Sequence, residues 1–235
     1  MQANEPPLRR VLLALDASGP SPAAISFAVT VAARFEAELD TLLLTQAELA
    51  RAAALPFASE ISLLAGMERR LDAATLQRRM QSLAERVRVT MTQIATPVRV
   101  RWSLELAVWP DWERLLAQPV SGSLFVLSHP PGHTSSHEST GQRDSSVCVV
   151  HHEAPPGLAA LEIATALDPG AIRLLVTRSL PDPGVTPDEG TQRLLACLLR
   201  QRPGTVVLPA DWYAARAGTL RPVFARTDCN LLLVA

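Results

Sequence analysis

The 235-residue sequence contains no lysine, so arginine and histidine supply all of its basic side chains. A chain without lysine cannot form a lysine Schiff base, and it cannot complete a Walker A phosphate loop. Aromatic residues make up only 4% of the sequence, although 48% of its residues are hydrophobic. The core must therefore consist mainly of leucine, valine and alanine, a composition that suits helices packed on a sheet.

The sequence also lacks a large net charge that could select a partner. Its 22 arginines nearly balance 23 acidic residues, which leaves a formal net charge of −1. Such a chain has no basic field to attract nucleic acid, so nucleic-acid partners are not expected. No apolar run approaches the ~18 residues of a membrane span, and the N-terminus has no signal-peptide core. We therefore expect a cytoplasmic protein without membrane insertion.

The three cysteines, Cys148, Cys197 and Cys229, are an odd number and have no metal-type spacing. All of them lie within or beside apolar runs, where a free thiol usually behaves as a small hydrophobic side chain. The pattern predicts free thiols in a reducing compartment.

What the sequence does contain is a complete β-α-β unit between residues 10 and 44. The unbroken apolar run Val11–Leu15 predicts a strand buried on both faces. Helical spacing of apolar residues predicts a helix after the turn at Gly19–Pro22, and a second strand follows at Thr41–Leu44. Asp16 therefore stands at the carboxyl end of a first parallel strand, at the crevice where open α/β sheets bind ligands.

This stretch resembles the universal stress protein family. In that family the first strand ends in Asp-x-Ser, the first helix is rich in Ser-x-x-Ala, and the second strand contains Ala-Glu-Leu. Leu15–Ser18, Ser21–Ala33 and Ala37–Leu44 follow that order. Beyond Leu44 the resemblance lies in the order of elements more than in residues.

The pattern continues as an alternation of helices and strands. A short helix is predicted at 46–54, and the longest helical pattern, at 69–95, predicts a crossover helix on a sheet, with a partner-binding helix as the alternative. Further strands are predicted at 98–106 and 124–127, with a brief helix at 111–117 between them. The order β-α-β-α-β-α-β implies a parallel sheet with right-handed crossovers, so we predict an α/β fold.

A second, shorter series follows. Residues 129–146 are rich in Pro, Gly, Ser, Thr and His and predict an exposed loop that divides the chain. The series beyond it repeats the first in outline and ends in an apolar strand at 231–234. The resemblance implies a tandem protein with a complete unit at 1–142 and a reduced second unit at 143–235. The strand at 147–150 is compatible with either unit.

Nucleotide-binding members of the family place the nucleoside near the first-strand Asp and a second-strand residue, and cradle the phosphates in a glycine-rich loop after strand four. By this resemblance Asp16, Ser18 and Leu44 would contact an adenine nucleotide, ATP or AMP, and Gly132 would lie in the loop. That loop reads Ser-His-Pro-Pro-Gly, so two prolines stand where backbone N–H donors are needed.

Features of both predicted units argue against a bound nucleotide cofactor. Asp16 and Ser18 have a second interpretation, as caps for the helix that starts near Ser21. In the second unit, Asp211 would bring a negative charge toward the phosphates, and the sequence His151–Glu153 replaces the first-strand Asp. We therefore expect no cofactor, with nucleotide binding in the first unit as the alternative.

The five histidines all lie between residues 129 and 152. Imidazole nitrogens are ordinary ligands of zinc and nickel, and His133, His137 and His151 are the candidate metal ligands. The intervening Pro, Gly, Ser and Thr argue against a helix that would place them on one face. A solvated polar loop is the simpler interpretation.

No catalytic constellation stands out, so no catalytic residue is expected, although a weak ATPase activity is left open. We expect a non-enzymatic stress-response or regulatory protein that acts through protein contacts. An adenine-nucleotide sensor and a metal-binding protein are the alternatives. Members of the family pair through their last strands, which implies an intramolecular pseudo-dimer and a further homodimer through the terminal strands.

Overall fold

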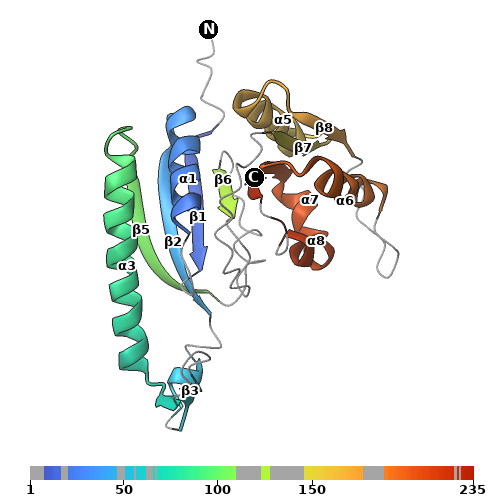
Figure 1. Ribbon diagram of the computed structural model, residues 1–235. Coiled ribbons are helices and arrows are strands. Elements are labelled where there is room, and N and C mark those ends of the chain that lie inside the picture. Colours follow the sequence, from blue (N-terminus) through green and yellow to red (C-terminus); the bar gives the residue numbers. More distant parts are fainter. Residues whose placement is uncertain are drawn as a thin grey trace.

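The computed structural model describes residues 8–16, 21–46, 51–55, 57–61, 66, 68–109, 123–127, 146–176, 188–224, 227 and 229–235. Within these residues the chain forms an eight-stranded sheet, a separate two-stranded hairpin, and helices on both faces of the sheet (Figure 1). The predicted α/β class is therefore confirmed. In this described part of the chain, no helix is both long and apolar enough to cross a bilayer.

Four strands from the first part of the chain lie side by side: β1 (Arg10–Asp16), β2 (Glu38–Gln46), β5 (Trp102–Trp109) and β6 (Ser123–Leu127). β1 is central, with β2 on one side and β6 on the other, and β5 pairs with the far edge of β2. All of these pairings are parallel, as predicted from the alternation of strands and helices. The strand order therefore reverses between β1 and β6, which is where open α/β sheets bind ligands.

The second group of strands consists of β7 (Val147–His151), β8 (Ile172–Leu175), β9 (Thr205–Pro209) and β10 (Asn230–Val234). β7 lies between β8 and β9, and β10 pairs with the other edge of β9, all in parallel. Residues 147–150, which the sequence left compatible with either unit, thus have β8 and β9 as neighbours. The predicted boundary between the two units, at residues 142 and 143, lies outside the described residues.

An antiparallel pairing of β10 with β6 joins the two groups into one sheet, in which Leu231 lies opposite Leu127 and Val234 opposite Leu124. Both edges of β10 are therefore occupied inside the chain. The predicted homodimer through terminal strands is wrong for this strand, because its backbone groups are already paired and its side chains are buried. The outermost described strands of the sheet are β5 and β8.

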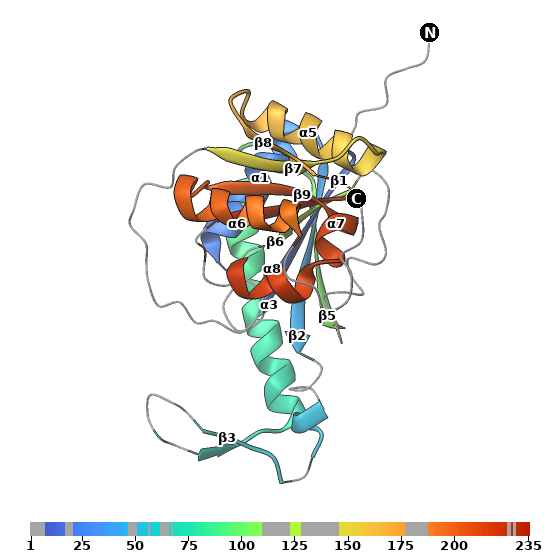
Figure 2. The ribbon, with the colours of Figure 1, turned by 90° about the vertical axis from the view of Figure 1, so that its right-hand side faces the viewer.

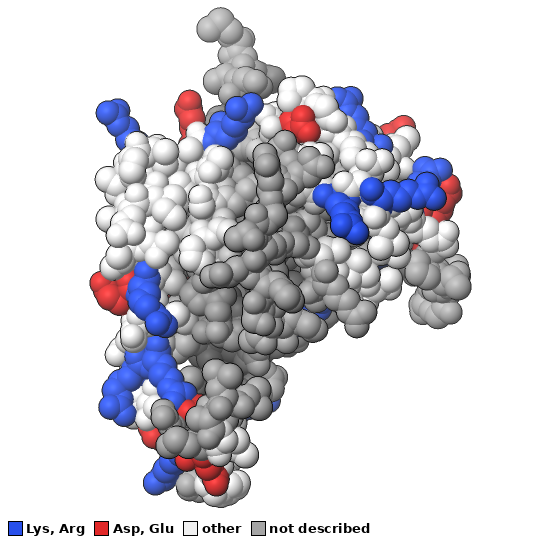
Figure 3. All heavy atoms as spheres, in the orientation of Figure 1, with Lys and Arg blue, Asp and Glu red and all other residues white. Residues whose placement is uncertain are grey.

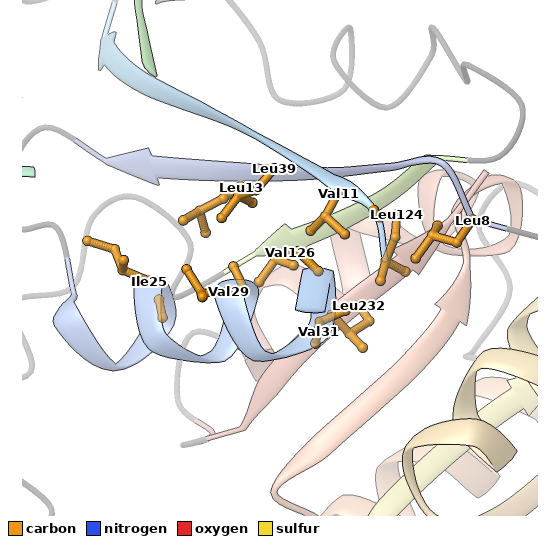
Figure 4. Packing of buried hydrophobic residues seen from close by; sticks show 14 of the residues in the cluster. Leu8, Val11, Leu13, Ile25, Val29, Val31, Leu39, Leu124, Val126 and Leu232 are labelled. Atoms are coloured by element: carbon orange, nitrogen blue, oxygen red, sulfur yellow. The ribbon is translucent and has the colours of Figure 1, made fainter. Parts of the chain in front are cut away.

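Helices cover the two faces of the sheet. One face carries α1 (Pro22–Arg34), α3 (Ala73–Ala95) and α5 (Pro155–Leu167), and the other carries α6 (Glu189–Gln201), α7 (Ala210–Ala214) and α8 (Ala217–Phe224). On the first face, Val31 of α1, Val126 of β6 and Leu232 of β10 belong to one cluster (Figure 4). The two groups of strands therefore share a core across their junction.

The start of α1 follows from its local sequence. Ser21 is the N-cap, and its side chain accepts a hydrogen bond from the Ala24 N–H. Pro22 occupies the first helical turn, where its missing N–H costs nothing. The N-cap of this helix is thus Ser21, whereas the second interpretation of Asp16 and Ser18 gave them the capping role.

The segment before α3 differs from the prediction. Residues 59–61 and 68–70 form an antiparallel hairpin of β3 (Ser59–Ile61) and β4 (Glu68–Arg70). β4 therefore occupies positions 69 and 70, where the sequence predicted the beginning of the long helix. The helix begins only after Asp72, whose side chain accepts a hydrogen bond from the Thr75 N–H at 2.8 Å. Of the short helix predicted at 46–54, the structure describes residues 51–53 as helical.

β5 also begins later than predicted. Residues 96–99 form a turn in which Arg99 has a positive φ of 58°, so an extended strand cannot run through this position. The strand starts at Trp102 instead of Val98 and continues to Trp109. The brief helix predicted at 111–117 lies outside the described residues.

Candidate functional site

Two of the residues predicted to contact a nucleotide are neighbours in the sheet. Asp16 ends β1, and its partner in the register of β2 is Leu44, a buried residue. Both therefore lie at the carboxyl edge beside the point where the strand order reverses. Ser18 and Gly132 lie outside the described residues, so nucleotide binding at this edge stays a prediction.

The histidine cluster is only partly described. His151 ends β7, and its pKa is lowered by partial burial and by the nearby charges of Arg173 and His152. His133 and His137 lie outside the described residues. Within the described part of the chain, no three His, Cys, Asp or Glu side chains are grouped so that they could hold a metal ion. The metal site proposed from the sequence therefore stays a prediction.

A second reversal of strand order lies between β7 and β9. Beside it, a pocket of ≈ 550 Å³ opens where β7 and β8 end and α6 begins. His152, which follows β7, is 2% exposed, and its Nδ1 accepts a hydrogen bond from the Ala154 N–H at 3.2 Å. The proton of a neutral ring is then on Nε2, which lies 3.8 Å from a carboxylate oxygen of Asp211. The pocket is lined by His152, Glu153, Ala154, Leu175, Val176, Glu189, Gly190 and Arg193.

The chain leaves β9 at this edge without a glycine loop. Pro209 is followed directly by α7, whose first turn contains Asp211. One oxygen of the Asp211 carboxylate accepts a hydrogen bond from the Trp212 N–H at 2.8 Å. An N–H group that could approach a phosphate is thus turned to the protein's own carboxylate, which would also repel an anion.

A buried arginine holds the helices around this edge together. The side chain of Arg216 is 3% exposed and forms an ion pair with Asp188, the N-cap of α6. Its Nε donates to Asp188 at 3.0 Å, and its Nη1 donates to the carbonyl oxygen of Trp212 at 3.2 Å. The guanidinium carbon also lies 4.4 Å from the centre of the Trp212 ring. Sequence reasoning missed this pair, although the spacing of Asp188 and Thr191 is that of a helix cap.

The ion pair makes stability depend on pH in a defined direction. Partial burial alone would raise the pKa of Asp188, but hydrogen bonds from Arg216 and Thr191 outweigh it and lower the pKa to about 2. Since the native value lies below the ordinary 3.8, the unfolded chain binds more protons in acid, and the contribution of Asp188 is lost as pH falls. We expect the difference in free energy of unfolding between the native protein and Asp188→Asn to shrink between about pH 5 and pH 2.

Urea denaturation of both proteins at several pH values measures this difference. Asp72, another helix cap with a lowered pKa, titrates in both proteins and so cancels. A difference that stays constant over this range would contradict the pairing of Asp188 with Arg216.

A second candidate site is an element that projects from the body of the protein. α3 has 23 residues and is about 35 Å long, but its buried side chains begin only at Leu83. The preceding turns, 73–82, carry no buried residue and end in the hairpin, well away from the sheet (Figures 1 and 2). We call the described residues between 51 and 82 the projecting arm.

The projecting arm has its own small set of stabilising contacts. Arg79 of α3 donates two hydrogen bonds to the Glu60 carboxylate of β3, at 2.6 and 2.5 Å. The Leu71 N–H donates to the carbonyl oxygen of Ala58 at 2.9 Å, and Leu71 is buried. These contacts fasten the hairpin to the first turns of α3.

The surface of the projecting arm combines apolar and basic side chains. Leu55, Phe57 and Ile61 are 48, 80 and 67% exposed, and they lie within seven positions of one another. Five arginines against three acidic residues between 51 and 82 give the arm a net positive charge, and both blue and red side chains are visible on it in Figure 3. Exposed apolar side chains on a projecting, charged element are typical of surfaces that bind other proteins.

Comparisons with known proteins give little beyond these observations. No protein-family model and no curated protein sequence matches the chain. Among solved structures, it is similar to a universal stress protein from Archaeoglobus fulgidus DSM 4304, with a TM-score of 0.48 and 11% sequence identity over 95% of each chain. The fold class and the sites therefore rest on the chain's own strands, helices and side chains.

Proposed function

We propose that this protein is a non-enzymatic regulatory protein of the cytoplasm that acts through protein contacts made by the projecting arm. The observation that carries the proposal is the exposure of Phe57 and Ile61 on an element that lies away from the core and whose hairpin is bonded to α3. Burying such side chains against a partner releases apolar surface from water, and aromatic side chains often dominate the energy of such contacts.

The side chains at the edge between β7 and β9 support the non-enzymatic part of the proposal. Its backbone donor at Trp212 is bound by Asp211, and Arg216 is engaged by Asp188. Neither group is therefore presented for a transferring phosphate, as phosphoryl chemistry would require. A role in binding is accordingly favoured over catalysis at this edge.

The arm also suggests the chemistry of its partner. An excess of arginine around apolar side chains fits an apolar depression with an acidic rim, because complementary charge raises the rate of association and fixes orientation. The partner we propose is therefore a protein with an acidic, partly apolar surface. This pairing would weaken at high salt, since exposed charges are screened.

Photo-crosslinking followed by affinity measurement tests the proposal. A photoreactive residue at position 57 is expected to capture a partner that one at position 199 does not, although Leu199 is 79% exposed on α6. With that partner purified, Phe57→Ser should weaken binding about tenfold or more, because an exposed aromatic anchor is lost. Titration calorimetry or surface plasmon resonance measures the change.

Leu199→Ser is the matched control and should leave the affinity unchanged, because the two positions are similarly exposed but lie on different elements. Both variants should keep the far-ultraviolet circular dichroism of the native protein, since exposed substitutions rarely affect folding. Equal affinities for the native protein and Phe57→Ser, or capture only from position 199, would refute the role of the arm.

A further inference from the structure

Two of the three cysteines meet in the core. Cys148 lies on β7 and Cys197 on α6, separated by 49 positions, and their Sγ atoms are 3.3 Å apart. Cys148 is 0% exposed and Cys197 is 7% exposed. Sequence spacing gave no indication of this pair, because the contact depends on how α6 crosses the sheet.

We propose that Cys148 and Cys197 form a redox-active dithiol site, which a hydroperoxide converts into a reversible disulfide. A disulfide has a sulfur–sulfur distance of about 2.05 Å, so the two sulfurs need to approach by only ~1.2 Å. The site is independent of the projecting arm, so it goes beyond the proposed function.

The chemistry balances with hydrogen peroxide as the oxidant. The Cys197 thiolate attacks one peroxide oxygen, the O–O bond breaks, and a sulfenic acid forms while the leaving hydroxide takes up a proton as water. The Cys148 sulfur then attacks the sulfenic sulfur, the S–O bond breaks, and a second water leaves with the Cys148 proton. Two thiols thus lose two electrons and two protons, and one peroxide becomes two waters.

The order of attack follows from burial. Burial raises the pKa of the Cys148 thiol, and the hydrogen bond and charge of Cys197 raise it further. A thiol that rarely ionises is a poor first nucleophile, whereas Cys197 is the thiol of the pair with some exposure. We therefore expect a slow first step at Cys197 and a fast second step between two sulfurs that are already close.

The position of the pair gives the disulfide a structural consequence. It would fasten α6 to β7. Asp188, the N-cap of α6, holds Arg216, and Gly190 in the first turn of α6 lines the pocket. Oxidation would therefore restrict the helix that forms one wall of that pocket. A local cross-link of this kind mainly suppresses partial opening of the region it closes.

Peptide mapping of the native protein tests the site directly. Cleavage after arginine places each cysteine in a separate peptide, since Cys148 lies in 144–173, Cys197 in 194–200 and Cys229 in 227–235. The folded protein is treated with hydrogen peroxide, the remaining thiols are alkylated in denaturant, and the digest is analysed by mass spectrometry without reduction. The expected product joins 144–173 to 194–200 and disappears after dithiothreitol.

Cys229→Ser is the matched control and should give the same linked peptides, whereas Cys197→Ser should give none. The map of the native protein decides the question even where Cys197→Ser does not fold. Peptides linked through Cys229 would overturn the assignment. So would alkylation of both Cys148 and Cys197 after oxidation strong enough to modify Cys229.

Discussion

Replacing Asp188 with alanine is expected to lower the free energy of unfolding by about 2–3 kcal/mol. The substitution removes the cap of α6 and takes the carboxylate away from Arg216, a cation whose side chain is 3% exposed. Breaking a fully buried pair typically costs about 3–5 kcal/mol. The lower figure applies because the Asp188 side chain is itself 31% exposed, so solvent screens part of the interaction.

The chain contains a matched control for this prediction. Asp72 caps α3 by accepting from the Thr75 N–H at 2.8 Å, the same distance at which Asp188 accepts from the Thr191 N–H. Asp72→Ala should therefore cost only the loss of a cap, because its carboxylate is not the partner of a buried arginine. Urea denaturation gives both free energies. Equal losses in the two variants would mean that Arg216 gains nothing from Asp188.

The strands and helices that could be predicted are those with a strong local pattern. Val11–Leu15 and Leu231–Val234 are unbroken apolar runs, and both are buried strands of the sheet. The hairpin of β3 and β4 was missed because its short strands are largely exposed and have no apolar alternation for a pattern to reveal. An apolar run in the sequence indicates a buried strand, but an exposed hairpin has no comparable sequence pattern.

The pairing partners of a strand were harder to predict from the sequence than the strand itself. The run at β10 predicts a strand, but nothing in it specifies that one edge meets β9 in parallel and the other meets β6 in antiparallel. That choice depends on how both groups of strands close over a shared core. The terminal strand, which was expected to pair with a second copy, consequently has both edges paired inside the chain.

The candidate sites also differ in whether they could be predicted from local sequence patterns. Asp16 and Leu44 could be placed at one edge of the sheet, because parallel strands end together. The pairs Asp188–Arg216 and Cys148–Cys197 could not, since their members are 28 and 49 positions apart and meet only through the packing of α6. Residues that interact through tertiary packing carry no fixed spacing in sequence.

Replacing Gly157 with alanine is expected to lower the free energy of unfolding by about 3 kcal/mol or more. A Cβ at this position of α5 would lie 2.3 Å from the carbonyl oxygen of His152 and 2.4 Å from its backbone nitrogen. Backbone atoms cannot move aside as a flexible side chain can, so α5 or the end of β7 must shift. The clash outweighs the roughly 1 kcal/mol by which alanine favours a helix over glycine.

Gly218→Ala is the control, because Gly218 is exposed in α8 and a Cβ there would meet no atom within 4 Å. This variant should be neutral or more stable by up to about 1 kcal/mol, since alanine restricts the unfolded chain. Urea denaturation of both variants measures the difference. If Gly157→Ala were as stable as the native protein, α5 would have to sit farther from His152 than the structure places it. In that case the close approach of α5 would not be what buries His152 and places it in the wall of the pocket.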